Sequence, residues 1–161
     1  MLRVLLVVFL FPAVALAEAA DPSTPTPVIF LTDKLDEPDN LGYCLDTVGR
    51  GRSDRMHIHS CKPRGGDVQF RFDDAGRIQS VAFPELCAEA TTSSTLALLP
   101  CSESSSQQFA YDPVSQEIRF ETECLVSSPS SRNAGPFMAR DLQIANCQET
   151  PKELKQWSVR N

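Results

Sequence analysis

Six cysteines fall into three pairs, and each pair is followed by an aromatic residue at a similar distance. The members of the pairs are 17, 14 and 23 residues apart, and the aromatic lies eight to ten residues after the second cysteine. The pairs are Cys44 with Cys61, Cys87 with Cys101 and Cys124 with Cys147, and the aromatics are Phe70, Phe109 and Trp157. A period of about 40 residues indicates a repeat protein whose units are too small to bury a core alone. The sequence therefore predicts three units around one shared core.

The first 17 residues are typical of a secretory signal peptide. A basic start at Met1 to Arg3 precedes the apolar run Val4 to Val14, and Ala15-Leu16-Ala17 has the pattern of a cleavage site. The run is shorter than the roughly 20 residues that span a bilayer, so no membrane insertion is expected. The sequence predicts a secreted or periplasmic protein whose signal is removed near Ala17.

Residues 18–27 alternate Pro with Ser and Thr, a composition typical of a linker, and 28–161 are expected to form a single domain. In an exported chain an even number of cysteines indicates disulfides before a metal site. Six cysteines allow about 15 pairings. The repeat favours three bonds within the units, each worth about 3 kcal/mol in the chain-entropy model.

Short apolar runs separated by turn residues predict an all-β domain. The runs are Val28 to Leu31, Met56 to Ser60, Val68 to Phe72, Ile78 to Val81, Leu96 to Leu99, Leu142 to Ala145 and Trp157 to Val159. Four short strands per unit predict twelve strands. The third unit lacks one, and we expect Val28 to Leu31 to supply it beside the C-terminus, which removes an exposed sheet edge. The longest loop is expected at Ser127 to Arg140.

The repeat resembles the ricin-B-type (Gln-x-Trp) β-trefoil lectin domain over Val28 to Asn161. The resemblance rests on Cys44-Leu45-Asp46, on Met56 to Cys61, and on Gln107-Gln108-Phe109 and Lys155-Gln156-Trp157. It implies a β-trefoil of three pseudo-repeats that binds a glycan and is not an enzyme. In such a lobe an acidic residue accepts hydrogen bonds from vicinal hydroxyls, an aromatic stacks on the pyranose, and an amide completes the polar contacts.

The first repeat matches these positions best. The resemblance implies carbohydrate contacts from four of its residues: Asp46 in the acidic position, His59 in the stacking position, Asp67 in the amide position and His57 in a further polar position. The second repeat is a weaker candidate, with Glu89 and Gln107 but with Leu99 in the stacking position. The third keeps Gln143 but has Val126, Ala145 and Leu154 in the acidic, stacking and amide positions, so it is expected to be structural.

The net charge of the chain disfavours one class of binding partner. The chain has 21 acidic and 15 basic residues and a formal net charge of −6, which disfavours nucleic acid as a partner. The glycan could be a galactose-type or an acidic sugar. The basic segment Arg50 to Arg55 near Asp46 could select acidic or sulfated sugars by Coulomb attraction, although a solvated loop explains the same residues.

Other functions have less support in the sequence. His57 and His59 share one face of a strand but lack a third metal ligand, and Asp73-Asp74 lacks the ligand pattern of a calcium loop. No catalytic motif and no cofactor site is evident. The remaining alternative is a degenerate trefoil that binds a protein, or inhibits an enzyme, through its loops.

Overall fold

The computed structural model describes residues 19–161, and the signal peptide expected at residues 1–17 lies outside this range. The described chain contains twelve strands, two 3₁₀ turns and no α-helix. The strands are β1 (Val28–Leu31), β2 (Tyr43–Thr47), β3 (Met56–Ser60), β4 (Phe70–Phe72), β5 (Ile78–Ser80), β6 (Leu86–Ala90), β7 (Leu96–Pro100), β8 (Ala110–Asp112), β9 (Glu117–Phe120), β10 (Glu123–Ala134), β11 (Phe137–Ala145) and β12 (Trp157–Arg160). The turns are η1 (Ser105–Gln107) and η2 (Lys152–Leu154).

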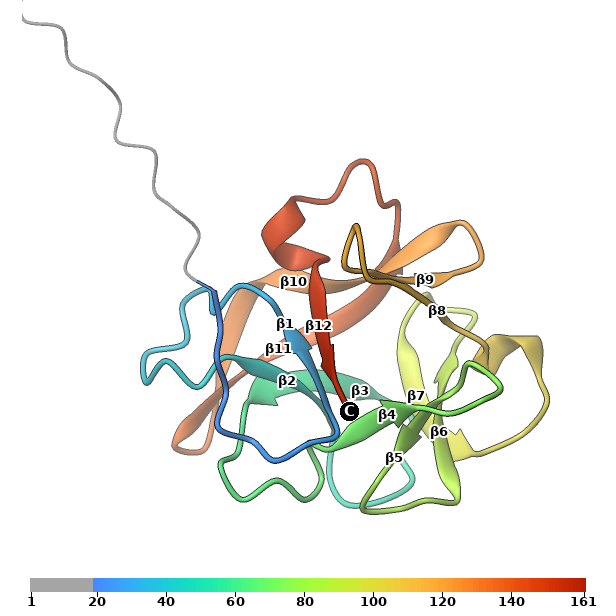
Figure 1. Ribbon diagram of the computed structural model, residues 1–161, viewed down its shortest axis with the longest axis horizontal. Coiled ribbons are helices and arrows are strands. Elements are labelled where there is room, and N and C mark those ends of the chain that lie inside the picture. The colour runs from blue at the N-terminus through green and yellow to red at the C-terminus, as the bar shows by residue number, and fades with distance from the viewer. Residues whose placement is uncertain (1–18) are drawn as a thin grey trace, which may run out of the picture.

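Each repeat contributes four consecutive strands, and the middle two form an antiparallel hairpin. These hairpins are β2–β3, β6–β7 and β10–β11. Eight strands form one sheet in the order β12-β1-β2-β3-β11-β10-β9-β8, and β4-β5-β6-β7 form the other. In Figure 1 the three repeats surround a common centre. This arrangement is a β-trefoil, as the family resemblance implied.

Strand β1 closes the domain as expected. It pairs antiparallel with β12 from Val28 opposite Arg160 to Leu31 opposite Trp157. Figure 1 shows the two strands side by side, with the C-terminus close to the start of β1. The first strand of repeat one thus pairs with the last strand of repeat three, and neither is left with an edge facing solvent on that side.

The three disulfides join Cys44 to Cys61, Cys87 to Cys101 and Cys124 to Cys147, which confirms the pairing within repeats. Each links the first strand of a hairpin to the residues directly after its second strand. The aromatics that follow are core residues, as predicted. Trp157 and Phe70 are fully buried, and the Trp157 indole Nε1 donates a hydrogen bond to the Leu125 carbonyl at 2.9 Å.

The segment Ser127 to Arg140, expected to be the longest loop, is instead the outer part of the β10–β11 hairpin. Its strands pair from Ser131 opposite Arg140 to Ala134 opposite Phe137, beyond an irregularity between Ser127 and Ser131. The loop was expected because clusters of serine, proline and glycine are typical of loops. Here β11 gains a second partner, since it also pairs with β3 of the first repeat.

Residues 19–27 contact the domain. The Ala20 amide donates to the Thr32 carbonyl at 2.7 Å, and Thr24 Oγ1 donates to the Lys62 carbonyl at 3.0 Å. Gln69 Nε2 donates to the Pro25 carbonyl at 3.1 Å. The division of the chain into a signal peptide, a linker and a domain stays a prediction. Among the residues from 19 onward, no helix has the length and apolar character needed to cross a membrane.

Candidate carbohydrate site

The β2–β3 hairpin carries three of the four residues expected at the first-repeat site. In its register Asp46 lies opposite His57, and Cys44 lies opposite His59. Because alternate residues of a strand point to the same face, Asp46, His57 and His59 share the face that also holds the disulfide. The hairpin therefore brings these side chains together, and the Cys44–Cys61 bond fixes the end of the hairpin next to them.

Lys62 joins the acidic position to the amide position of this repeat. Its Nζ donates to Asp46 Oδ2 at 3.0 Å and to Asp67 Oδ1 at 2.7 Å. The Asp46 side chain is only 3% exposed, whereas those of Lys62 and Asp67 are 27% and 30% exposed. The Thr47 amide donates to Asp46 Oδ1 at 2.7 Å. Both oxygens of Asp46 are thus already hydrogen-bonded within the protein.

Burial changes the titration of this cluster. Removal from water raises the pKa of Asp46 to about 6, and the negative charge of Asp67 acts in the same direction, whereas Lys62 opposes both. Burial also lowers the pKa of Lys62, but the hydrogen bond to Asp67 and the charge of Asp46 outweigh it and leave that pKa raised. Lys62 therefore stays charged at neutral pH, and Asp46 becomes protonated in mildly acidic solution.

His57 is held between the first and third repeats. Its Nε2 lies 3.9 Å from Asp46 Oδ2, and its Nδ1 lies 3.1 Å from Arg132 Nη2. Burial and the positive charge of Arg132 lower the pKa of His57 to about 4, so the ring is neutral at pH 7. Since a guanidinium can only donate, Nδ1 accepts, and the ring proton is assigned to Nε2, on the side of Asp46.

His59 is poorly placed to stack on a sugar. It is 8% exposed, and its Nδ1 lies 2.9 Å from the Ser60 carbonyl, which assigns the proton to that nitrogen. The Phe137 ring, from the tip of the third-repeat hairpin, meets it edge-on with centroids 5.3 Å apart. Phe137 is partly exposed and covers the histidine that the sequence placed in the stacking position.

In the second repeat the two candidates contact each other. Gln107 Nε2 donates to Glu89 Oε2 at 2.8 Å and to the Pro100 carbonyl at 3.0 Å, and Gln107 Oε1 accepts from the Ser102 amide at 2.8 Å. Gln107 is fully buried. Its amide therefore ties the end of the β6–β7 hairpin to η1. Of the two candidates only Glu89 remains partly exposed.

We expect Gln107→Leu to lower the free energy of unfolding by about 1.5 kcal/mol, because the Ser102 amide and the Pro100 carbonyl would lose their partner. Urea unfolding followed by Trp157 fluorescence measures the change. Gln108→Leu is the matched control, since Gln108 is exposed and its side chain is not part of this network. Equal unfolding midpoints for the two variants would contradict the assigned role.

The third repeat lacks the polar set that a sugar needs. Val126 is buried and lies opposite Gln143, which is exposed, and Leu154 is buried. What this repeat contributes instead is the outer hairpin, whose Arg132 and Phe137 contact the first repeat. Sequence reasoning missed Lys62, Arg132 and Phe137. Only Lys62 gave a local signal, because it is a cation directly after the second cysteine of its repeat.

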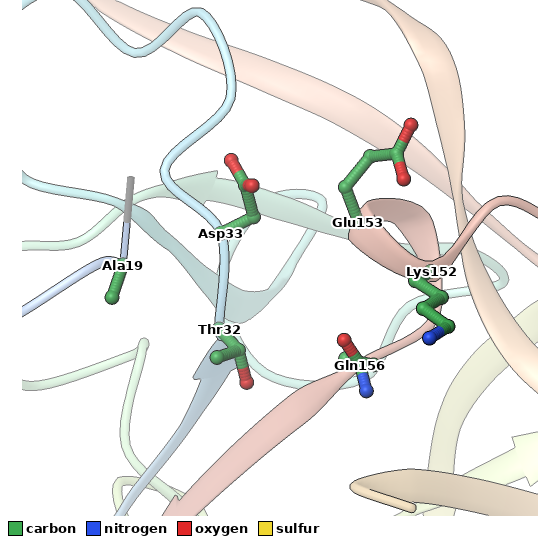
Figure 2. Close-up of a pocket in the computed structure, with 6 residues that line it drawn as sticks. All are labelled: Ala19, Thr32, Asp33, Lys152, Glu153 and Gln156. Carbon is green, nitrogen blue, oxygen red and sulfur yellow. The ribbon is translucent and has the colours of Figure 1, made fainter. Parts of the chain in front are cut away.

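Two hollows lie outside these positions. One, of about 320 Å³, is lined by the six residues drawn in Figure 2, which come from the end of β1, from η2, from Gln156 and from Ala19. The other, of about 450 Å³, is lined by residues around the β9–β10 turn and Cys147. None of the residues lining either hollow is a predicted sugar contact.

One group of described residues has potential metal ligands close together, namely Glu117, Cys124 and Cys147. Both sulfurs belong to a disulfide, so neither is a thiolate that could bind a metal. The Glu117 carboxylate instead pairs with Arg119 at 2.6 Å and with Lys155 at 2.9 Å. These two cations hold the pKa of Glu117 below its usual value.

A comparison of the sequence with models of protein families gives the same result as the fold and the threefold repeat. The model of the ricin-type beta-trefoil lectin domain matches residues 34–157, which is most of the chain. The protein therefore belongs to this family. No curated protein matches the chain.

Solved structures with the same fold include sugar-bound proteins. A non-toxic homologue of type II RIPs from Momordica charantia (bitter gourd), in complex with α-methyl-D-galactoside, is 14% identical with a TM-score of 0.63. The β-trefoil lectin of the Vibrio vulnificus hemolysin/cytolysin, with N-acetyl-D-lactosamine bound, is 13% identical with a TM-score of 0.53. GalNAc-T7, with UDP, GalNAc and Mn²⁺, is 19% identical with a TM-score of 0.56.

These matches cover 83%, 82% and 74% of the present chain. They cover 47% of the bitter gourd chain, 90% of the Vibrio chain and 20% of the GalNAc-T7 chain. At these identities the likeness shows the fold alone. The chain spans about a fifth of GalNAc-T7 and about half of the bitter gourd protein.

Proposed function

We propose that the protein is a secreted, non-catalytic carbohydrate-binding domain whose first repeat holds the sugar. One observation carries the proposal: two carboxylates of the first repeat, Asp46 and Asp67, converge on a single ammonium group at the surface. The two carboxylate oxygens that now accept from Lys62 Nζ can also accept from two vicinal hydroxyls of a pyranose.

Binding then proceeds by exchange at Lys62. The Lys62 side chain is partly exposed and flexible, so its Nζ can move towards solvent while sugar hydroxyls take its two hydrogen bonds. When sugar hydroxyls replace Lys62 as the hydrogen-bond donors to Asp46, the buried carboxylate keeps its partners. The cost of an unpaired buried charge is thereby avoided. The exchange predicts modest affinity for one site, which several sites on an array of glycans would strengthen through avidity.

Galactose-type sugars are the first ligands to test. The bitter gourd protein binds α-methyl-D-galactoside, and the Vibrio lectin binds N-acetyl-D-lactosamine. Acidic sugars are the second class, since Arg50, Arg52 and Arg55 are exposed beyond β2 and β3. A glycan array, followed by calorimetry on the best ligand, tests the proposal. Absence of binding to every glycan would refute it.

The titration of Asp46 predicts how affinity depends on pH. A sugar hydroxyl donates to the ionised carboxylate, and the pKa of Asp46 in the unliganded protein is about 6. We expect affinity to be constant above pH 7 and to fall roughly tenfold by pH 5, where about a tenth of the carboxylate is ionised. His57 stays neutral over this range, because its pKa is about 4.

Calorimetry between pH 5 and pH 8 measures this dependence. The variant His59→Phe keeps an aromatic ring beside Phe137 but removes the other imidazole, so it should retain the same pH profile. A profile that is flat in the wild type, or that disappears in His59→Phe, would show that Asp46 is not the titrating group.

A second candidate function is favoured by the pairing of Asp46 with Lys62. If this ion pair does not open, the buried Asp46 carboxylate cannot accept from a sugar, and the protein is a degenerate trefoil that binds a protein partner, or inhibits an enzyme, through its loops. The array separates the two candidates, because a degenerate trefoil would bind no glycan.

A further inference from the structure

The outer face of the first-repeat hairpin continues without a break onto the third-repeat hairpin. Strand β11 pairs with β3, with Ala139 opposite His59 and Asp141 opposite His57, and β10 pairs with β11 on its other side. The strands β2, β3, β11 and β10 are therefore consecutive in one sheet. Residues opposite one another share a face, so Asp141 lies on the same face as Asp46 and His57.

The third repeat places an exposed ion pair beside His57. Arg132 Nη2 lies 3.2 Å from Asp141 Oδ1 and 3.1 Å from His57 Nδ1. The Arg132 and Asp141 side chains are 41% and 52% exposed, in contrast to the buried Asp46. A chain of polar contacts thus runs from Asp46 through His57 to Arg132 and Asp141, from a buried acceptor to donors and acceptors at the surface.

An aromatic ring lies on the same face, four residues before Asp141 on β11. Phe137, at the hairpin tip, is partly exposed and packs edge-on against His59. The apolar faces of pyranose rings pack well on such rings, while sugar hydroxyls both donate and accept hydrogen bonds. An exposed Arg–Asp pair and an aromatic ring on one face of this hairpin together offer all three kinds of contact without a net charge.

We infer that the outer β10–β11 hairpin forms a second subsite, so that the ligand is a neutral oligosaccharide of at least two sugar units bound across repeats one and three. The first unit lies at Asp46 and Asp67, as in the proposed function on which this inference rests. The second unit stacks on Phe137 and bonds to Arg132 and Asp141. The third-repeat hairpin is longer than the other two hairpins. Under this inference its extra length contributes to ligand specificity.

Calorimetry with N-acetyl-D-lactosamine and α-methyl-D-galactoside tests the inference, because the first probe has two sugar units and the second has one. We expect the wild type to bind the disaccharide at least tenfold more tightly. Asp141→Ala and Phe137→Leu should each reduce this ratio to below threefold while leaving the affinity for the monosaccharide unchanged. Phe137→Tyr, which keeps the ring, should retain the wild-type ratio.

Gln143→Ala is the matched control, because Gln143 is an exposed residue of β11 on the same face, two residues from Asp141. It should leave both affinities unchanged, and thermal melting should show every variant folded. Equal affinity of the wild type for both probes, or an unchanged ratio in Asp141→Ala and Phe137→Leu, would overturn the inference and leave the proposed function intact. Failure of both probes to bind would overturn the inference, whereas the proposed function falls only if no glycan on the array binds.

Discussion

Reduction of the three disulfides is expected to unfold the domain. Each bond closes a loop within one repeat, between residues separated by 17, 14 and 23 positions, and contributes about 3 kcal/mol. A domain of this size has a total stability of about 5 to 15 kcal/mol, so the loss of all three is comparable with the whole. Trp157 is fully buried in the native state, so its fluorescence and the near-ultraviolet circular dichroism both report the loss.

Reduction should be carried out at increasing concentrations of a thiol reductant, with the number of released thiols counted at each step. The oxidised protein in the same buffer is the control. An unchanged melting temperature once all six thiols are titrated would contradict this prediction. It would show that packing between the repeats stabilises the domain without the disulfides.

The variant Asp46→Ala is expected to lose most of its sugar affinity. Hydrogen bonds to a charged group contribute about 1.5 to 3 kcal/mol, which corresponds to roughly 10-fold to 150-fold in the dissociation constant. The effect follows from the position of Asp46, whose Oδ2 forms one of the two Lys62 hydrogen bonds that the sugar replaces. Calorimetry with the best ligand from the array measures it.

Asp54→Ala is the matched control, since it removes an exposed carboxylate from the turn of the same hairpin. It should bind as the wild type does. Thermal melting distinguishes lost binding from lost structure in Asp46→Ala. Should that variant be folded and bind with wild-type affinity, the first repeat is not the sugar site.

The repeat, the strands and the disulfides could be predicted because their signals are local or periodic. The cysteine pairs recur at a period that fixes three units, and the core aromatics recur after each pair, as Trp157 illustrates. The closing partner of β12 was predictable for another reason. A count of four strands per unit, started at the first cysteine of each pair, left one strand missing, and Val28–Leu31 was the apolar run that lies before the first cysteine.

The candidate site could be predicted only in part, because its neighbours come from distant positions. Asp46 and His57 are close in the hairpin register, but Arg132 is 75 residues from His57 and comes from another repeat. The strand that carries Arg132 is rich in serine, a residue whose clusters are typical of loops. Pairing of β11 with both β10 and β3 overrides that preference, and no sequence period reports such a contact.

The seam between β1 and β12 determines how the domain would respond to mechanical tension. Val28, at the start of β1, lies opposite Arg160, at the end of β12, so a force applied to these two residues acts at the same end of the ladder. The pairs would separate one after another instead of sharing the load. The three hairpins would remain closed after the seam had opened, because each disulfide joins residues of a single repeat.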